Sequence, residues 1–135
     1  MVRKLDEEVS LVSGSLFSGG GVGDVGIEWG AKIPVLAACE LVPSRAALIR
    51  SNFPDTKVFE GDVWKLQDAY VSHFKSKLEG KRPWLLTLSP PCQGMSSNGA
   101  GRISAAIRQG NRPEEDERNR LILPGINVLE QLKPD

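Results

Sequence analysis

The 135-residue sequence has little cysteine and histidine and no long apolar run, and each shortage excludes a class of protein. Two cysteines, Cys39 and Cys92, cannot form a disulfide framework and do not have the spacing of a zinc site. The single histidine, His73, falls in a helical pattern and adds no ligand cluster. No segment reaches transmembrane length, and the first residues show no signal-peptide pattern. We therefore expect no metal, no membrane partner and a reducing, cytosolic environment.

The sequence also lacks an excess of either charge, because 17 basic residues balance 17 acidic ones. A protein that binds nucleic acid by itself usually carries a basic surplus, so the composition gives no support to DNA binding by this chain alone. The 40% hydrophobic and 25% charged residues are typical of a globular chain of one domain, or of part of one.

Short apolar runs alternate with helical patterns along the chain, and this alternation predicts an α/β fold with a doubly wound, mainly parallel sheet. The order of the strands cannot be read from the sequence. The expected strands are 9–17, 35–39, 57–59 and 84–88, and the expected helices are 44–52, 64–79 and a last helix that contains residues 121–132.

The helix expected at 44–52 follows Pro43, and Ser44 is a candidate for its N-terminal cap. Its apolar residues predict the buried face, namely Ala46, Ala47, Leu48 and Ile49.

A glycine-rich loop follows the first expected strand, and a short helix is expected over Ile27–Trp29, ending at Gly30. Glycine tolerates positive φ and allows a ligand to approach the backbone closely. Residues 21–26 fit the dinucleotide fingerprint G-x-G-x-x-G, whereas residues 17–21 resemble the Phe-x-Gly-x-Gly loop of S-adenosylmethionine enzymes. A plain structural turn is the third interpretation.

An acidic residue, Glu40, ends the second expected strand. A carboxylate at this place can accept hydrogen bonds from both ribose hydroxyls, and both nucleotide interpretations use it. Cys39 alternates into the strand and is expected in the core. After the third strand Asp62 is a candidate for the cap of the next helix.

The most informative stretch is 84–96, an apolar strand that two prolines end. Neither Pro90 nor Pro91 can donate an N–H to a sheet, so Cys92 is expected on a rigid turn at the lip of the sheet, where ligands bind. A lone cysteine is more often a small buried hydrophobic residue. The glycine loop upstream and the acid at the right distance favour a nucleophile instead.

The segment Pro91-Cys92-Gln93, together with Ser96, resembles the catalytic stretch of the cytosine carbon-5 DNA methyltransferases. The resemblance implies a Rossmann-like, S-adenosylmethionine-dependent methyltransferase fold, DNA as substrate and a bacterial or phage restriction-modification setting in the cytoplasm, or the nucleus of a eukaryote. Cys92 would add to the cytosine ring, and Gln93 and Ser96 would close over the site.

The same resemblance implies S-adenosyl-L-methionine as cofactor and S-adenosyl-L-homocysteine as product. It places Asp62 near the adenine amino group. The implied cofactor-binding residues are Phe17, Ser18, Gly19, Gly21, Glu40, Leu41, Asp62, Val63 and Pro90.

The resemblance covers nearly the whole chain but only the first part of the family's catalytic domain. Family members follow a Lys-Pro like Lys133-Pro134 with a Glu-Asn-Val motif, which this sequence does not contain. The target-recognition region and the C-terminal motifs are also absent. We therefore expect residues 1–135 to be the N-terminal portion of the domain, inactive alone and in need of the missing portion or a complementing subunit to bind DNA.

The segment from Gly94 to Glu117 is polar and is predicted to be a long loop, either functional or disordered. Its arginines, Arg102, Arg108 and Arg112, could meet phosphates. Two other functions stay open. One is an NAD-binding dehydrogenase domain, based on residues 21–26 and Glu40, and the other is a non-catalytic subunit.

Overall fold

One parallel sheet forms the centre of the molecule. The computed structural model describes residues 11–79, 81–91, 97–111 and 117–135. Four strands of the described residues pair in the order β3-β2-β1-β4, and all neighbours are parallel. They are β1 (Leu11–Leu16), β2 (Val35–Glu40), β3 (Lys57–Glu60) and β4 (Arg82–Leu88). Each lies where the sequence predicts a strand, and the mainly parallel α/β fold is confirmed.

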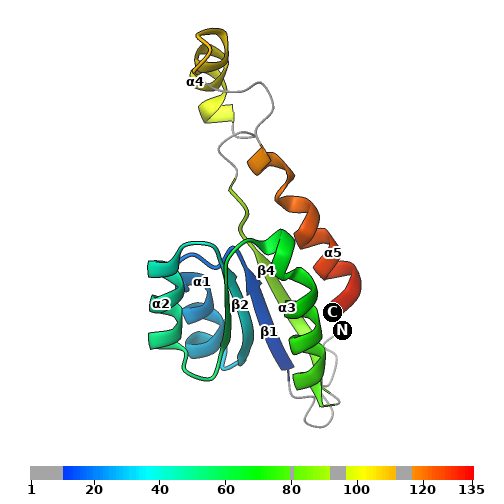
Figure 1. Ribbon diagram of the computed structural model, residues 1–135. Helices are drawn as coiled ribbons and strands as arrows, with labels where there is room; N and C mark the ends of the chain where they lie inside the picture. The colour runs from blue at the N-terminus through cyan, green and yellow to red at the C-terminus, as the bar shows by residue number, and fades with distance from the viewer. Residues whose placement is uncertain (1–10, 80, 92–96, 112–116) are drawn as a thin grey trace, which may run out of the picture.

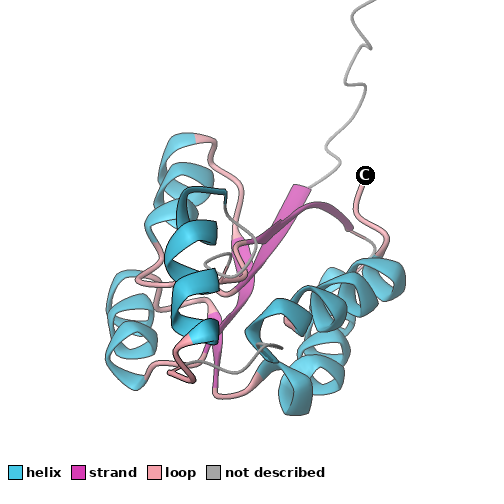
Figure 2. Ribbon diagram, turned by 90° about the horizontal axis from the view of Figure 1, so that it is seen from above, coloured by secondary structure: helices cyan, strands magenta, loops and turns pink. Residues whose placement is uncertain are grey.

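Helices cover both faces of the sheet. In Figure 1, α1 and α2 lie on one side and α3 and α5 on the other, and Figure 2 shows the sheet between these two layers from above. In Figure 1, α4 projects beyond the ends of the strands. The helical elements are α1 (Val22–Val25), the π-helical turn η1 (Gly26–Gly30), α2 (Pro43–Asn52), α3 (Val63–Leu78), α4 (Ser97–Arg108), the 3-10 turn η2 (Glu117–Arg120) and α5 (Ile122–Leu132).

The larger part of the core lies between the sheet and α3. Tyr70 and Phe74 of α3 are fully buried and stack on each other over β1. Gly14 in β1 makes this packing possible, because a Cβ at that position would collide with the Tyr70 hydroxyl and the Phe74 ring. The Tyr70 hydroxyl, buried with its ring, donates to the Ala37 carbonyl of β2 at 3.2 Å, which satisfies its proton.

The smaller part of the core lies under α2. Ala46 and Ile49 are buried against Ala38 and Val58 of the sheet, with Phe53 beside them. The prediction of a buried face was therefore right for two of its four residues. Ala47 and Leu48 instead face solvent, because a ten-residue helix lying on a sheet buries one narrow stripe.

Two expected helix starts were wrong. Ser44 does not cap α2, since Val42 occupies the cap position and Pro43 is the first helical residue, where its missing N–H costs nothing. The helix after the glycine loop begins at Val22 rather than Ile27, because glycines 23 and 26 continue the helical turns. Gly30 ends it as predicted.

The prediction of a long loop over 94–117 was also wrong where the structure describes that range, because α4 occupies Ser97–Arg108. The segment contains alanines and arginines, which favour helix. Arg112 lies outside the described residues.

Parallel register brings the carboxyl ends of the strands to the same edge of the sheet. Leu16 of β1 pairs with Cys39 of β2 and with Leu88 of β4, and Glu40 of β2 pairs with Glu60 of β3. The loops that follow these residues therefore converge. In open parallel sheets this edge is where ligands bind.

Candidate functional site

A pocket of about 620 Å³ opens at the carboxyl ends of the strands, a size typical of a site for a small molecule. Its walls come from the ends of β1 and β2, from the turns that lead into α2 and α3, and from the segments after β4 and before α5. The residues that line it are Phe17, Gly19, Cys39, Glu40, Leu41, Val42, Arg45, Gly61, Asp62, Val63, Ser89, Pro91, Arg118 and Leu121.

The loop after β1 has an unusual backbone. Phe17 has a φ of 58°, a left-handed value that costs free energy in a residue other than glycine. Gly19 and Gly21 follow with φ values of 58° and 80°, which glycine adopts freely. These three residues turn the chain sharply from β1 into α1 and expose the backbone of Gly19 to the pocket.

Glu40 connects this loop to β2. Its side chain is buried, with 5% exposed, and its Oε2 accepts a 2.7 Å hydrogen bond from the Gly19 N–H. Its Oε1 accepts from the Val42 N–H at 3.0 Å. A carboxylate has about four acceptor sites, so both oxygens keep capacity for a hydroxyl donor such as a ribose diol.

Asp62 has two expected roles, the cap of the next helix and a contact with the cofactor. It caps α3, because its Oδ1 accepts a 3.0 Å hydrogen bond from the Trp64 N–H. It also lines the pocket, together with Gly61 and Val63. The helix cap is thus observed, and a contact with the adenine amino group stays a prediction.

The apolar wall of the pocket comes from the turn after β2. Leu41 is 65% exposed, an unusual position for a large apolar side chain, and Val42 lies beside it. Exposed apolar residues at the mouth of a pocket supply a surface on which a flat ring can pack.

Seven residues that line the pocket were not among the predicted site residues, namely Cys39, Val42, Arg45, Gly61, Ser89, Arg118 and Leu121. Arg45 comes from the first turns of α2, while Arg118 and Leu121 come from the segment just before α5. No local motif marks Arg118 or Leu121, because their position depends on how α5 packs against β4. The closeness of that packing is set by Gly125, where a Cβ would lie 2.9 Å from Leu88.

The remaining predicted residues are placed as follows. Pro91 lines the pocket, whereas Ser18, Gly21 and Pro90 do not. The Ser18 backbone N–H donates instead to the Cys39 carbonyl at 3.1 Å. The three other residues predicted to be catalytic, Cys92, Gln93 and Ser96, lie outside the described residues.

Cys39 touches the pocket but is not a reactive thiol. Its side chain is 2% exposed, in agreement with the expectation of a core residue. Burial, followed by the charges of Glu40 and Asp62, raises the pKa of Cys39 to about 12. The thiol is therefore protonated at neutral pH and its role is to pack.

Among the residues that the structure describes, no group of three or more His, Cys, Asp or Glu side chains is arranged to bind a metal. None of the helices in this part of the chain is long and apolar enough to cross a membrane.

The loop after β1 departs from a dinucleotide site. That site needs its third glycine for close packing of helix on strand, yet a Cβ at Gly26 would meet nothing within 4 Å.

The sheet order, the glycine loop after β1 and the acidic end of β2 define a Rossmann-like fold of the methyltransferase type. Residues 12–135 match the family of C-5 cytosine-specific DNA methylases, and the chain belongs to this family.

Among curated relatives, the Type II methyltransferase M1.HgaI of Avibacterium volantium is 32% identical over 120 residues, which are 89% of this chain and 31% of that protein. The Type II methyltransferase M.AquIA of Picosynechococcus sp. is also 32% identical over 120 residues, covering 89% of this chain and 44% of that protein. M.NgoPII of Neisseria gonorrhoeae is 32% identical over 89% of this chain and 30% of its own length.

A solved E. coli structure, described as a DNA modification methyltransferase encoded within a prophage, superposes with a TM-score of 0.66 and 25% identity. The match covers 93% of this chain and 30% of that chain. The chain thus spans less than half the length of each of these relatives.

Proposed function

We propose that this chain takes part in the transfer of a methyl group from S-adenosylmethionine to carbon 5 of cytosine in DNA. The observation that carries the proposal is the buried carboxylate of Glu40, bound to the Gly19 N–H at the edge of a pocket, in a chain that belongs to the C-5 cytosine-specific DNA methylase family. In this proposal the chain is the N-terminal portion of the catalytic domain and supplies the cofactor pocket and the cysteine turn.

The pocket residues have distinct proposed tasks. Glu40 accepts hydrogen bonds from the ribose hydroxyls, and Leu41 and Val63 pack against the adenine ring. Asp62 accepts from the adenine amino group, and Phe17 and Gly19 shape the part of the pocket beside β1. S-adenosylmethionine, when bound, supplies an electrophilic methyl group on a sulfonium. Gly21, Ser18 and Pro90 act through the shape of the two loops.

Cys92 is the proposed nucleophile. Carbon 5 of cytosine is a poor nucleophile in an aromatic ring, and addition of a thiolate to carbon 6 makes it enamine-like. After carbon 5 has accepted the methyl group, loss of its proton lets the carbon–sulfur bond break and returns the thiolate. The position of Pro91 at the pocket supports this role, because a rigid proline sets where the next residue starts.

The DNA side of the reaction needs more than this chain. The target base must leave the duplex, as in DNA methyltransferases generally, and Gln93 and Ser96 are proposed to close over it. With equal numbers of basic and acidic residues, the chain alone offers no attraction to DNA. We therefore propose that the further length seen in the relatives, on the same chain or on a complementing subunit, supplies DNA binding, and that the chain alone is inactive. The bacterial relatives support a cytoplasmic setting.

Calorimetry tests the cofactor. We expect S-adenosylhomocysteine to bind the full chain weakly and NAD not to bind. Tighter binding of NAD would overturn the methyltransferase interpretation. An assay with labelled S-adenosylmethionine and DNA tests the rest, because robust methyl transfer by the chain alone would refute the need for a further portion.

Alkylation tests the nucleophile. Because Cys39 is buried and its pKa lies at about 12, iodoacetamide at neutral pH should modify Cys92 alone. Bound S-adenosylhomocysteine should slow that reaction. A Cys39→Ser variant should behave like the natural chain, and a Cys92→Ser variant should not react. Modification of Cys92 only after unfolding would contradict a nucleophile at the lip of the sheet.

A further inference from the structure

A buried acid lies directly beneath the glycine loop, and the proposed reaction does not use it. Asp24 of α1 is 2% exposed, and its Oδ2 lies 3.1 Å from the Oγ of Ser15 in β1. The Ser15 Oγ lies 2.6 Å from the Oγ of Ser18, and the Ser18 Oγ lies 3.3 Å from the Cys39 carbonyl oxygen. These three contacts form a continuous chain of polar groups from α1 across β1 to β2.

The number of available protons decides which group donates and which accepts in each of these three contacts. Each serine hydroxyl has one proton to donate. If Asp24 is a carboxylate, the two hydroxyls have two protons for three contacts, so one contact is left without a hydrogen. If Asp24 is a neutral acid, it donates to Ser15, Ser15 donates to Ser18, and Ser18 donates to the Cys39 carbonyl. Only the neutral acid makes all three hydrogen bonds.

The chain of hydrogen bonds ends where the loop after β1, residues 17–21, meets β2. We call this segment the cofactor loop. Ser18 precedes Gly19, and Cys39 precedes Glu40, so the Ser18–Cys39 hydrogen bond adjoins the Gly19–Glu40 hydrogen bond. Both hold the loop in the left-handed turn that begins at Phe17. The Ser18 backbone N–H donates to the same Cys39 carbonyl at 3.1 Å, so loss of the hydroxyl bond would weaken, without removing, the connection that holds the loop presenting Gly19 to the pocket.

We propose that Asp24 is a positioning residue for the cofactor loop, which it holds through Ser15 and Ser18 as a neutral hydrogen-bond donor, so that its ionisation weakens cofactor binding. This inference rests on the proposed function for its ligand, but the state of the loop can be measured without any ligand.

The surroundings of Asp24 favour the neutral acid. Burial raises the pKa of Asp24, a hydrogen bond donated by Ser15 to the carboxylate works in the opposite direction, and the charge of Glu28 on η1 raises it; the pKa that results is raised, which favours the neutral acid. Tyr70 of α3 also interacts electrostatically with Asp24, and it interacts in the same way with Cys39. None of these groups, within the described part of the chain, is a cation that would favour the carboxylate.

The first test follows the affinity for S-adenosylhomocysteine by calorimetry from about pH 4.5 to about pH 8.5. In the natural chain we expect the affinity to fall on the order of three- to tenfold as pH rises through the Asp24 pKa, the effect of one lost hydrogen bond. Asp24→Asn keeps an N–H donor toward Ser15 and cannot ionise, so it should hold the tight affinity at every pH. Ser15→Ala should bind weakly at every pH.

A second variant, at Glu28, should shift the pH at which the affinity falls and leave the chain of hydrogen bonds intact. Glu28→Gln removes a charge that raises the Asp24 pKa, so the fall in affinity should move to lower pH. The glutamine can still accept the hydrogen bond that the Val35 N–H now donates to Glu28. An Asp24→Asn variant with the pH profile of the natural chain, or with weak binding at every pH, would overturn the proposal.

Amide hydrogen exchange of the free chain separates this inference from the identity of the cofactor. The protection factors of the Ser18 and Gly19 amides should fall with rising pH in the natural chain and change less in Asp24→Asn. Any other pH-dependent contribution is present in both proteins and cancels in the comparison. If S-adenosylhomocysteine does not bind but protection differs as expected, the cofactor is wrong and the role of Asp24 stands. Equal protection in the two proteins overturns that role.

Discussion

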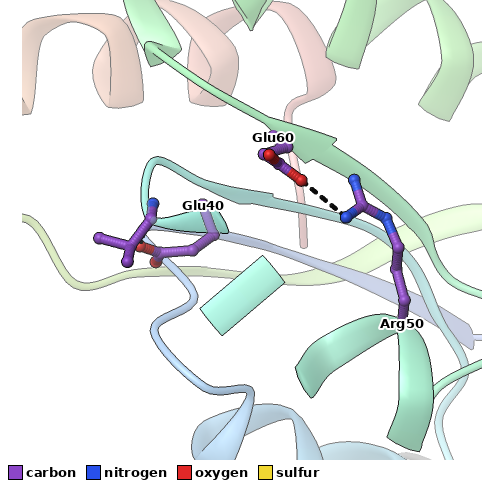
Figure 3. Close-up of polar contacts among 4 residues, drawn as sticks. Glu40, Arg50 and Glu60 are labelled. Atoms are coloured by element: carbon purple, nitrogen blue, oxygen red, sulfur yellow. Dashed lines mark hydrogen bonds and ion pairs between the residues drawn. The ribbon is translucent and has the colours of Figure 1, made fainter. Parts of the chain in front are cut away.

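Two glutamates end neighbouring strands of the sheet and have different surroundings. Glu40 of β2 and Glu60 of β3 are partners in the parallel register. Glu40 is buried and accepts from two backbone N–H groups, whereas the side chain of Glu60 is 35% exposed and pairs with Arg50 of α2 at 2.7 Å (Figure 3). The difference shows that residue type and strand position do not suffice to make a site. Glu40 differs from Glu60 because the glycine loop folds back over β2 and donates the Gly19 N–H to its carboxylate.

The largest difference between the two glutamates should appear in ligand binding. Glu40→Gln loses a charged acceptor at the pocket, and we expect the affinity for S-adenosylhomocysteine to fall on the order of 10- to 100-fold in calorimetry. Glu60→Gln is the matched control and should leave the affinity unchanged. Equal losses in the two variants would break the comparison, because the effect would then be one of strand ends in general.

The next largest difference should appear in stability. In Glu40→Gln the new amide NH₂ points toward a backbone N–H that now donates to the carboxylate, so one buried donor loses its partner. We expect the free energy of unfolding in urea to fall by about 1–3 kcal/mol. Glu60→Gln removes only an exposed ion pair and should cost less than about 1 kcal/mol. A cost in Glu60→Gln as large as that in Glu40→Gln would contradict the assignment of burial to Glu40 alone.

Alkaline pH offers a third comparison, through Cys39. Its thiol has a pKa of about 12 in the folded chain against an ordinary value of 9.0, and Glu40 is one cause of the rise. The folded chain therefore binds more protons than the unfolded one between these values, and the free energy of unfolding falls as pH rises through this window. The fall for one thiol is at most about 1.4 kcal/mol per pH unit.

Urea unfolding at several pH values above about 9 measures that fall. The window should end at a lower pH in Glu40→Gln, because one cause of the raised Cys39 pKa is gone, so the total loss of stability from this thiol should be smaller. In Glu60→Gln the window should be unchanged. Tyr70, whose pKa burial also raises, contributes to the slope in every variant. A Cys39→Ala variant gives the slope without the thiol. A fall that ends at the same pH in Glu40→Gln and in the natural chain would argue against a charge on Glu40 close to Cys39.

The smallest effect belongs to Arg50. Its guanidinium pairs with Glu60 in solvent, with 48% of its side chain exposed. We expect Arg50→Ala to change the free energy of unfolding by less than about 1 kcal/mol, and the change to shrink as salt is added. Thermal unfolding at low and high salt measures it. A large, salt-independent loss would mean that the β3 end is more constrained than its exposure indicates.

Much of this site could be predicted from the sequence, because its main signals are local. An apolar run followed by glycines, and a second run followed by Glu40, indicate strands whose carboxyl ends carry ligand-binding loops. The helix cap at Asp62 was one of two interpretations left open, and it is observed. The errors at Ser44 and in α4 came from local signals that compete, since cap residues and glycines also occur inside or beside helices.

Local sequence determined which segments of this protein become strands and helices, and which loops hold glycine, acid and proline. Only the tertiary structure decided the strand order β3-β2-β1-β4, the burial of Glu40 under Gly19, and the arrival of Arg118 and Leu121 at the same pocket. The physical reason is distance along the chain. Backbone preference and apolar periodicity act over a few residues, whereas pairing of parallel strands joins segments that no short pattern connects.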